Sequence, residues 1–249
     1  MVDWDTLTWT PGALTNSFDV DSGNAGNDVT VSVSGDTAAL TTSLVTGTPM
    51  TPAITRGFDG GFSPGHNTLE LAVNFASNAQ ALTVTINFAA SYTNGVAYVS
   101  FNLFDIDFAN SSGNTYQDLI KSISATSTTG TSIAPTITGV GANTTLAGTG
   151  LTQTLTGNTS TVDTGAGSGN ANATITFNAT NIKSIAFTYS STSMFANPTY
   201  QHIGIDDITY TVVPEINASW LSLFLCTSLA TWSTLRRHKS LGRTSPHRQ

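Results

Sequence analysis

Short runs of alternating apolar and polar residues, separated by turn-forming residues, recur along most of this chain and constrain its fold more than any other feature. Thr, Val, Ile and Phe dominate the runs, and clusters of Gly, Asn, Asp and Ser separate them. A period of two residues is the pattern of a β-strand with one buried face, and turn clusters between such runs are typical of antiparallel sheets. No stretch before residue 214 shows a sustained helical period. The runs that we expect to form strands are 28–34, 68–75, 82–88, 96–108, 118–125, 173–177, 182–189 and 202–213.

Strands of this kind predict an all-β fold, an antiparallel β-sandwich that is jelly-roll-like, formed by residues 1–213 as one domain. A chain of 249 residues with 39% hydrophobic residues is long enough to bury such a core. Asn94-Gly95 lies between two expected strands and predicts a hairpin, because both residue types tolerate the positive φ of a type I′ turn. Residues 126–172 are richer in Thr, Gly and Asn, and we expect edge strands or long loops there.

The charged residues are few and unevenly distributed. They make up 9% of the chain, against about a quarter in ordinary soluble domains. All fifteen acidic residues precede residue 216, together with only three of the eight basic ones. The excess of acidic residues before residue 216 argues against nucleic-acid binding, which needs basic groups to neutralise phosphates. The single cysteine, Cys226, leaves residues 1–213 without a disulfide framework, a thiolate metal cluster or a cysteine nucleophile.

The composition changes abruptly after Val213. Residues 216–235 carry no charge over twenty positions, about the length that a helix needs to cross the hydrocarbon core of a membrane. Trp220 and Trp232 lie near the two ends of this span, and basic residues follow it directly. We therefore expect one C-terminal transmembrane helix, with residues 240–249 as a basic cytoplasmic tail and the acidic body outside. A buried C-terminal helix of a soluble protein is the alternative, but it does not explain the basic run.

The C-terminal part of the chain resembles the PEP-CTERM sorting signal of Gram-negative bacteria. Residues 214–239 carry the order of that signal, a short Pro-Glu motif, a hydrophobic span and an arginine cluster, although Ile216 stands where the family usually has a second proline. The resemblance implies export, processing by the membrane protease exosortase, and a link to exopolysaccharide and biofilm production. An ordinary single-pass C-terminal anchor is the alternative. The residues that carry the resemblance are Val213, Pro214, Glu215, Arg236 and Arg237.

An exported body needs a signal peptide, and Met1 is followed directly by strand-like sequence. We therefore expect that the signal peptide lies upstream of Met1 or has been removed from the sequence, and that the protein is located at the cell surface or outside the cell. The function we expect is a non-catalytic structural or adhesive role in the surface layer or matrix. The alternative is a carbohydrate-binding module, or a glycoside-active sandwich that uses paired acids, and its partner would be an extracellular polysaccharide.

Two acidic pairs are candidate metal ligands. Asp105 and Asp107 alternate with apolar residues in the run 96–108, so in a strand their carboxylates would share one face. Asp206 and Asp207 form a second pair, and the Ile-Asp-Asp-Ile sequence around them resembles the closing strand of jelly-roll carbohydrate-binding and adhesive modules. The resemblance implies structural Ca²⁺, a hard cation that takes six to eight oxygen ligands. The alternative is that the first pair points to solvent and the second bonds nearby backbone.

The loop 56–66 combines Phe58 and Phe62 with His66 and several glycines. Exposed aromatic rings in such a loop would stack on sugar rings, so both phenylalanines are candidate ligand-binding residues. The alternative is that the two rings close the end of the sandwich. We expect His66 and His202 to be structural, because neither has another histidine or a cysteine near it in the sequence.

Overall fold

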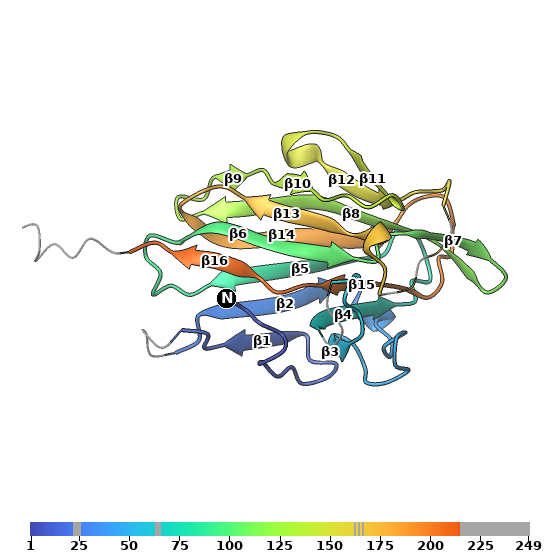
Figure 1. Cartoon of the computed structure of the whole chain (residues 1–249), viewed down its shortest axis with the longest axis horizontal. Helices are drawn as coiled ribbons and strands as arrows, with labels where there is room; N and C mark the ends of the chain where they lie inside the picture. Colours follow the sequence, from blue (N-terminus) through green and yellow to red (C-terminus); the bar gives the residue numbers. More distant parts are fainter. Residues whose placement is uncertain (22–25, 63–65, 162, 164, 166, 215–249) are drawn as a thin grey trace, which may run out of the picture. The chain divides into compact units, whose positions relative to one another are not determined.

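The computed structural model describes residues 1–21, 26–62, 66–161, 163, 165 and 167–214, and all but the last of these belong to the unit Met1–Val213 (Figure 1). The unit is built from strands connected by loops and three short 3₁₀ turns. The strands are β1 Thr15–Phe18, β2 Val29–Gly35, β3 Ala53–Arg56, β4 Asn67–Val73, β5 Ala81–Phe88, β6 Val96–Phe104, β7 Phe108–Ser111, β8 Asn114–Ser127, β9 Ser132–Ile133, β10 Thr136–Thr138, β11 Thr144–Ala147, β12 Thr154–Gly157, β13 Ala173–Phe177, β14 Ile182–Ser191, β15 Gln201–Ile205 and β16 Thr209–Val212. The 3₁₀ turns are η1 Thr37–Ala39, η2 Gly150–Thr152 and η3 Gly169–Ala171.

The strands form two layers. One layer has the order β1-β2-β5-β14-β8-β12-β11, and the other has β10-β13-β6, with β15 and β16 both pairing with the free edge of β6. Beyond β15, the second layer continues through β4 to β3. A single residue pair, Ile182 with Val96, links β14 to β6 and joins the layers. Every pairing among the described strands is antiparallel, so the predicted all-β antiparallel sandwich is confirmed.

The core lies between these layers and follows from the alternation in the sequence. In β5 and β13 every second residue is buried, and the intervening residues are partly or fully exposed. Phe101 of β6 stacks on Phe187 of β14 across the core, with 6.1 Å between the ring centroids. Apolar side chains removed from water in this way are the main source of stability in a domain without disulfides.

The turn at Asn94-Gly95 differs from its prediction. β5 pairs with β2 and β14, whereas β6 pairs with β13, β15 and β16, so the two strands flanking the turn belong to different layers and form no hairpin. Gly95 has a positive φ and donates its N–H to the carbonyl of Tyr92, whereas Asn94 is not left-handed. A turn forms at this position, but the predicted type I′ hairpin is wrong, because the partner of each strand is decided by core packing.

The predicted strand 96–108 is interrupted after Phe104. Asp105 has a φ of 64°, a left-handed conformation that ends the ladder and that Asp tolerates better than most residues. The chain resumes as β7, which pairs with β8. The predicted strand 202–213 is likewise divided, into β15 and β16. Both interruptions bring acidic residues to the ends of strands.

The region 126–172 contains short edge strands, which is one of the two structures predicted for it. β9, β10, β11 and β12 each contain two to four residues and pair at the margins of the two layers. Within the described ranges, no helix reaches the length and apolar character needed to cross a membrane. The predicted transmembrane segment 216–235 and the tail 240–249 lie outside those ranges.

Candidate functional site

A pocket of about 330 Å³ opens between the loop after β3, the edge of β6 and the start of β13. Its walls carry one aromatic ring, three polar side chains and several glycines. The side chains are those of Phe62, Asn102, Asn172 and Thr174. The size lies at the lower end of the range for small-molecule sites, and the mixture of one apolar surface with a few polar groups is typical of them.

Phe62 is the exposed aromatic wall of this pocket. Its side chain is 62% exposed, and its ring rests against the fully buried ring of Phe104 with 5.5 Å between centroids. Gly60 and Gly61 both have positive φ, and a Cβ at Gly60 would lie 2.5 Å from the Phe104 ring. These glycines let the loop lie close to β6, so the ring of Phe62 packs against Phe104 and still remains largely exposed to solvent.

The polar lining is oriented by hydrogen bonds that leave one acceptor free. Asn172 donates its Nδ2 to the carbonyl of Gly60 at 2.9 Å, while its buried Oδ1 has no partner among the described residues. Thr174 Oγ1 donates to Asn102 Oδ1 at 2.7 Å, and Asn102 Nδ2 donates to Asp206 Oδ2 at 2.6 Å. A buried acceptor without a partner costs free energy, so Asn172 favours a ligand that brings a hydroxyl or amide donor.

Behind Asn102 lies a cluster of His66, Asp206 and Asp207. His66 Nε2 is hydrogen-bonded to Asp206 Oδ1, and one ligand atom from each of the three residues lies within 4.8 Å of the others. Burial alone lowers the pKa of His66, but the hydrogen bond and charge of Asp206 outweigh it and raise the pKa above its ordinary value. Burial, with the charge of Asp206, raises the pKa of Asp207.

A second histidine, His202 of β15, lies between two buried carboxylates. Its Nε2 is 2.9 Å from Asp105 Oδ2, and its Nδ1 is 3.2 Å from Glu70 Oε1. Burial alone lowers the pKa of His202, but hydrogen bonds to Asp105 and Glu70 raise it to about 10. Phe58 packs its ring edge-on against the imidazole at 4.7 Å. The raised pKa favours the protonated form of His202, which donates to both carboxylates, while burial raises the pKa of Asp105 against the lowering effect of His202.

A third group surrounds Asp118 of β8. Tyr189 and Gln201 donate to Asp118 Oδ1 at 2.9 and 2.8 Å, and the backbone N–H of Asp107 donates to Oδ2 at 3.2 Å. Tyr116 donates its hydroxyl to Asp107 Oδ1 at 3.0 Å. Burial, followed by the charge of Asp107, raises the pKa of Asp118 well above its ordinary value. These bonds connect β8, β14, β15 and the segment just before β7 inside the fold.

The structure brings some predicted residues together and separates others. Asp105 and Asp107 do not share the face of a strand, nor do they point to solvent; both are buried, with separate partners in His202 and Tyr116. Asp206 and Asp207 lie together beside His66, and Asp207 Oδ1 accepts from the backbone N–H of Trp4 at 2.9 Å. Calcium binding at either pair stays a prediction.

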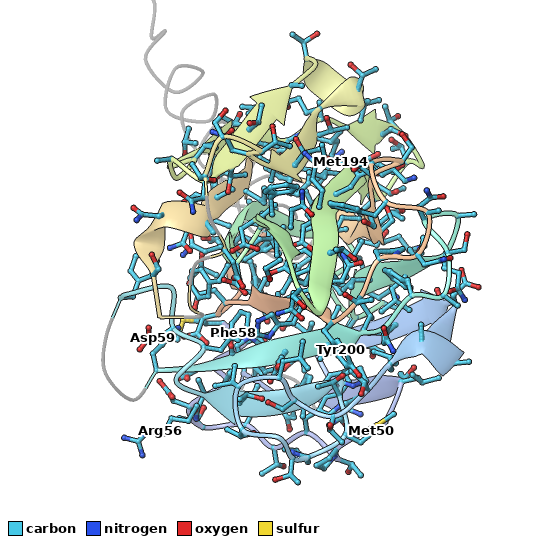
Figure 2. The ribbon with its side chains drawn as sticks, turned by 90° about the vertical axis from the view of Figure 1, so that its right-hand side faces the viewer. Met50, Arg56, Phe58, Asp59, Met194 and Tyr200 are labelled. Carbon is cyan, nitrogen blue, oxygen red and sulfur yellow. The ribbon has the colours of Figure 1, made fainter. Side chains whose placement is uncertain are left out.

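The two phenylalanines have different environments. Phe58, labelled in Figure 2, is fully buried, so the prediction that it stacks on a sugar ring is wrong. Its ring packs edge-on against His202 instead. In the same view Arg56 extends outward from the end of β3. Of the sorting-signal residues, Val213 donates its N–H to the carbonyl of Gly95, and Pro214 is the last described residue, whereas Glu215, Arg236 and Arg237 lie outside the described ranges.

Asn172, Glu70 and Asp118 were not identified from the sequence, and His66 and His202 were interpreted as structural. Asp118 begins a predicted strand, and Glu70 lies within another at a position that the alternation assigns no special role. Their acidic character inside apolar runs is the one sequence signal available for them. Asn172 carries no signal, because its significance depends on a loop more than a hundred residues away.

No family model matches this chain, and no curated protein matches it. Among solved structures, it is similar to a carbohydrate-binding module of family 28 specific for non-crystalline cellulose, with 11% identity, 71% of this chain and 89% of that chain covered, and a TM-score of 0.37. It is also similar to a family 11 module from Clostridium thermocellum in complex with a β-1,3-1,4-mixed-linked tetrasaccharide, with 15% identity, 81% and 97% coverage, and a TM-score of 0.28. At these TM-scores the likeness carries no conclusion about a ligand.

Proposed function

We propose that residues 1–213 form a non-catalytic carbohydrate-binding domain and that the pocket beside Phe62 holds the carbohydrate. The observation that carries this proposal is the pairing of an exposed, supported aromatic ring with a buried acceptor that has no partner among the described residues. A sugar ring has an apolar C–H face and a rim of hydroxyl groups. The pocket offers a complementary group to each.

The individual contacts follow from the chemistry of the lining. The C–H face of a sugar would pack on the exposed face of Phe62, as apolar groups do on aromatic rings. A hydroxyl would donate to Asn172 Oδ1 and relieve the cost of its unpaired state. Thr174 and Asn102 already bond to each other, so they are held in place before a ligand arrives. Such preorganisation lowers the entropy cost of binding.

The lining favours binding over hydrolysis. Glycoside hydrolysis uses two carboxyl groups on either side of the scissile bond, about 5–10 Å apart. The described residues of this pocket contribute amide, hydroxyl and aromatic groups and no carboxylate. Asp206 lies behind Asn102 and bonds to its amide. The domain is therefore proposed as a binding module and not as a glycosidase.

We also propose that the protein is displayed at the cell surface or in the extracellular matrix through its C-terminal segment. The support is the sequence: an uncharged span at 216–235, a basic tail, and a motif at Val213, Pro214 and Glu215 that resembles a PEP-CTERM signal. Its partners would then be the membrane, an exosortase-type protease and extracellular polysaccharide.

The binding proposal is tested with Phe62→Ala against a panel of soluble polysaccharides, including β-glucans, xylan and a bacterial exopolysaccharide, by affinity electrophoresis and calorimetry. Loss of one aromatic contact, worth about 1 kcal/mol, would weaken binding roughly fivefold without a change in the melting temperature. Met194→Ala is the matched control, since Met194 is 53% exposed and does not line the pocket. Equal affinity of both variants, or no binding of any glycan by the wild type, contradicts the proposal.

The location is tested by expressing the gene with its upstream region and measuring where the product resides and its C-terminal mass. A surface-exposed product, with or without a cleaved C-terminus, supports display. An intact product found only in the soluble cytosolic fraction overturns it.

A further inference from the structure

The cluster of His66, Asp206 and Asp207 contains one imidazole and two carboxylates, and none of the three residues lines the proposed carbohydrate pocket. His66 comes from the segment before β4, and the two aspartates come from the turn between β15 and β16. One ligand atom of each residue lies within 4.8 Å of the other two, a spacing that a single metal ion can bridge. The fold thus brings together, from distant parts of the chain, one imidazole nitrogen and two carboxylate oxygens.

The ligand side chains are held by further hydrogen bonds, as is usual around protein metal sites. Asn102 Nδ2 donates to Asp206 Oδ2 at 2.6 Å, which leaves Oδ1 directed at His66 Nε2. Trp4 donates its backbone N–H to Asp207 Oδ1 at 2.9 Å. On the far side of the imidazole, Asp5 Oδ2 lies 3.5 Å from Nδ1. A carboxylate behind a histidine in this way fixes the ring so that Nε2 faces the metal.

The charges around the cluster favour a cation. Asp5 adds a third carboxylate next to the one imidazole, so even a protonated His66 leaves an excess of negative charge. Asp206 is buried, which reduces the screening of its charge by water. A divalent cation at the centre would replace the proton shared by His66 and Asp206 and offset the repulsion between Asp206 and Asp207.

We propose that His66 Nε2 and one carboxylate oxygen each of Asp206 and Asp207 bind a single divalent transition-metal cation, with Zn²⁺ as the best match. Imidazole nitrogen is a good ligand for zinc, which accepts nitrogen and carboxylate oxygen together in tetrahedral sites. Calcium takes six to eight oxygens, and this cluster supplies two carboxylates and a nitrogen. Three protein ligands leave a fourth position for water. This site revises the metal expected at Asp206 and Asp207. It lies outside the sugar pocket but is connected to it through the hydrogen bond from Asn102 to Asp206.

The test uses the full, untagged chain after treatment with a chelator, followed by titration with Zn²⁺ or Ca²⁺. We expect native mass spectrometry to show one Zn²⁺ per chain. The melting temperature should rise by about 5–10 °C at a zinc concentration about 100 times the dissociation constant. Ca²⁺ at the same concentration should give no comparable shift.

Two variants assign the binding to these residues. His66→Gln and Asp207→Asn should each weaken Zn²⁺ binding at least tenfold, whereas Asp36→Asn, which removes an exposed carboxylate elsewhere, should bind zinc like the wild type. Absence of stoichiometric zinc, a preference for Ca²⁺, or unchanged zinc binding in His66→Gln would each overturn the proposal. Phe62→Ala should retain zinc, so failure of the metal site and failure of the carbohydrate proposal are distinguishable.

Discussion

Two histidines in this domain lie between carboxylates, and their surroundings give them different roles. His202 contacts Asp105 and Glu70, whose side chains are 2% and 0% exposed. His66 contacts Asp206 and also Asp5, whose side chain is 42% exposed. Glu70 is further satisfied by the hydroxyl of Ser43 and the backbone N–H of Leu44. We therefore infer a buried, structural ion triad around His202, and a more exposed cluster around His66 whose ligand atoms lie within 4.8 Å of one another.

The difference teaches that a histidine with two acidic neighbours is not in itself a functional signature. What matters is whether both of its nitrogens are already paired with buried carboxylates. Both nitrogens of His202 bond to carboxylates that water does not reach, so its proton is held and its geometry is fixed. His66 has a third carboxylate nearby, that of Asp207, which a cation would bridge. Two substitutions and a change of pH test this comparison.

The largest expected effect comes from His202→Gln. Removing the cation leaves Asp105 and Glu70 buried without charge compensation, which typically costs about 3–5 kcal/mol in the free energy of unfolding. Urea denaturation measures this loss. The matched control is His66→Gln in zinc-free buffer, which should cost about 1 kcal/mol, because Asp206 keeps its bond from Asn102. Equal losses in the two variants would remove the distinction between the two sites.

The second expected effect comes from pH and is spread over several pH units. The pKa of His202 is about 10 in the folded protein, above its ordinary value of 6.5, so the folded state binds this proton more tightly than the unfolded chain does. The corresponding stability is fully present below about pH 6.5 and is lost as the pH rises through 10, by at most about 1.4 kcal/mol per pH unit. Unfolding free energies measured from pH 6.5 to 9.5 should show this decline. The decline should be absent in His202→Gln, and an identical slope in both proteins would contradict a charged His202.

The smallest expected effect comes from Gly204→Ala. This substitution disturbs the packing of Phe58 on His202 without changing the charge of His202 or its two carboxylate partners. A Cβ at Gly204 would lie 2.2 Å from the ring of Phe58, which packs on His202. Overpacking of this kind costs about 1–3 kcal/mol. Urea denaturation measures the effect, and Gly165→Ala, where a Cβ meets nothing within 4 Å, is the control. Zinc binding at His66 should persist in Gly204→Ala, and its loss would show that the two histidine sites are not independent.

Local alternation predicted much of the fold. Residues 173–177 form β13 with the predicted bounds, and the predicted strand 82–88 differs from β5 by one residue. The pairing of strands was less accessible, because Asn94-Gly95 carries a local turn signal that contains no information about which layer each neighbouring strand joins. The edge strands β9 to β12 are short and rich in Thr, so their alternation is too brief to separate strand from loop.

The candidate sites depend on contacts between distant residues, which no local pattern encodes. The acidic pair Asp206 and Asp207 was identified as a possible ligand set, but its partner His66 is 140 residues away from Asp206 in the sequence. Phe62 was identified from its loop, and Phe58, four residues earlier, was assigned the same role although it faces the core. The burial of a loop residue is set by the surfaces that fold against it.

The position of β6 has a mechanical consequence. Val96, at one end of the strand, pairs with Val212, close to where the chain leaves the domain, while Asn102 and Phe104 at the other end lie at the Phe62 pocket. If the chain is held beyond Val213 and a glycan is held at Phe62, tension runs lengthwise between β16 and β6. The hydrogen bonds between the two strands are then loaded together in shear, a geometry that resists pulling better than one in which the bonds open one after another.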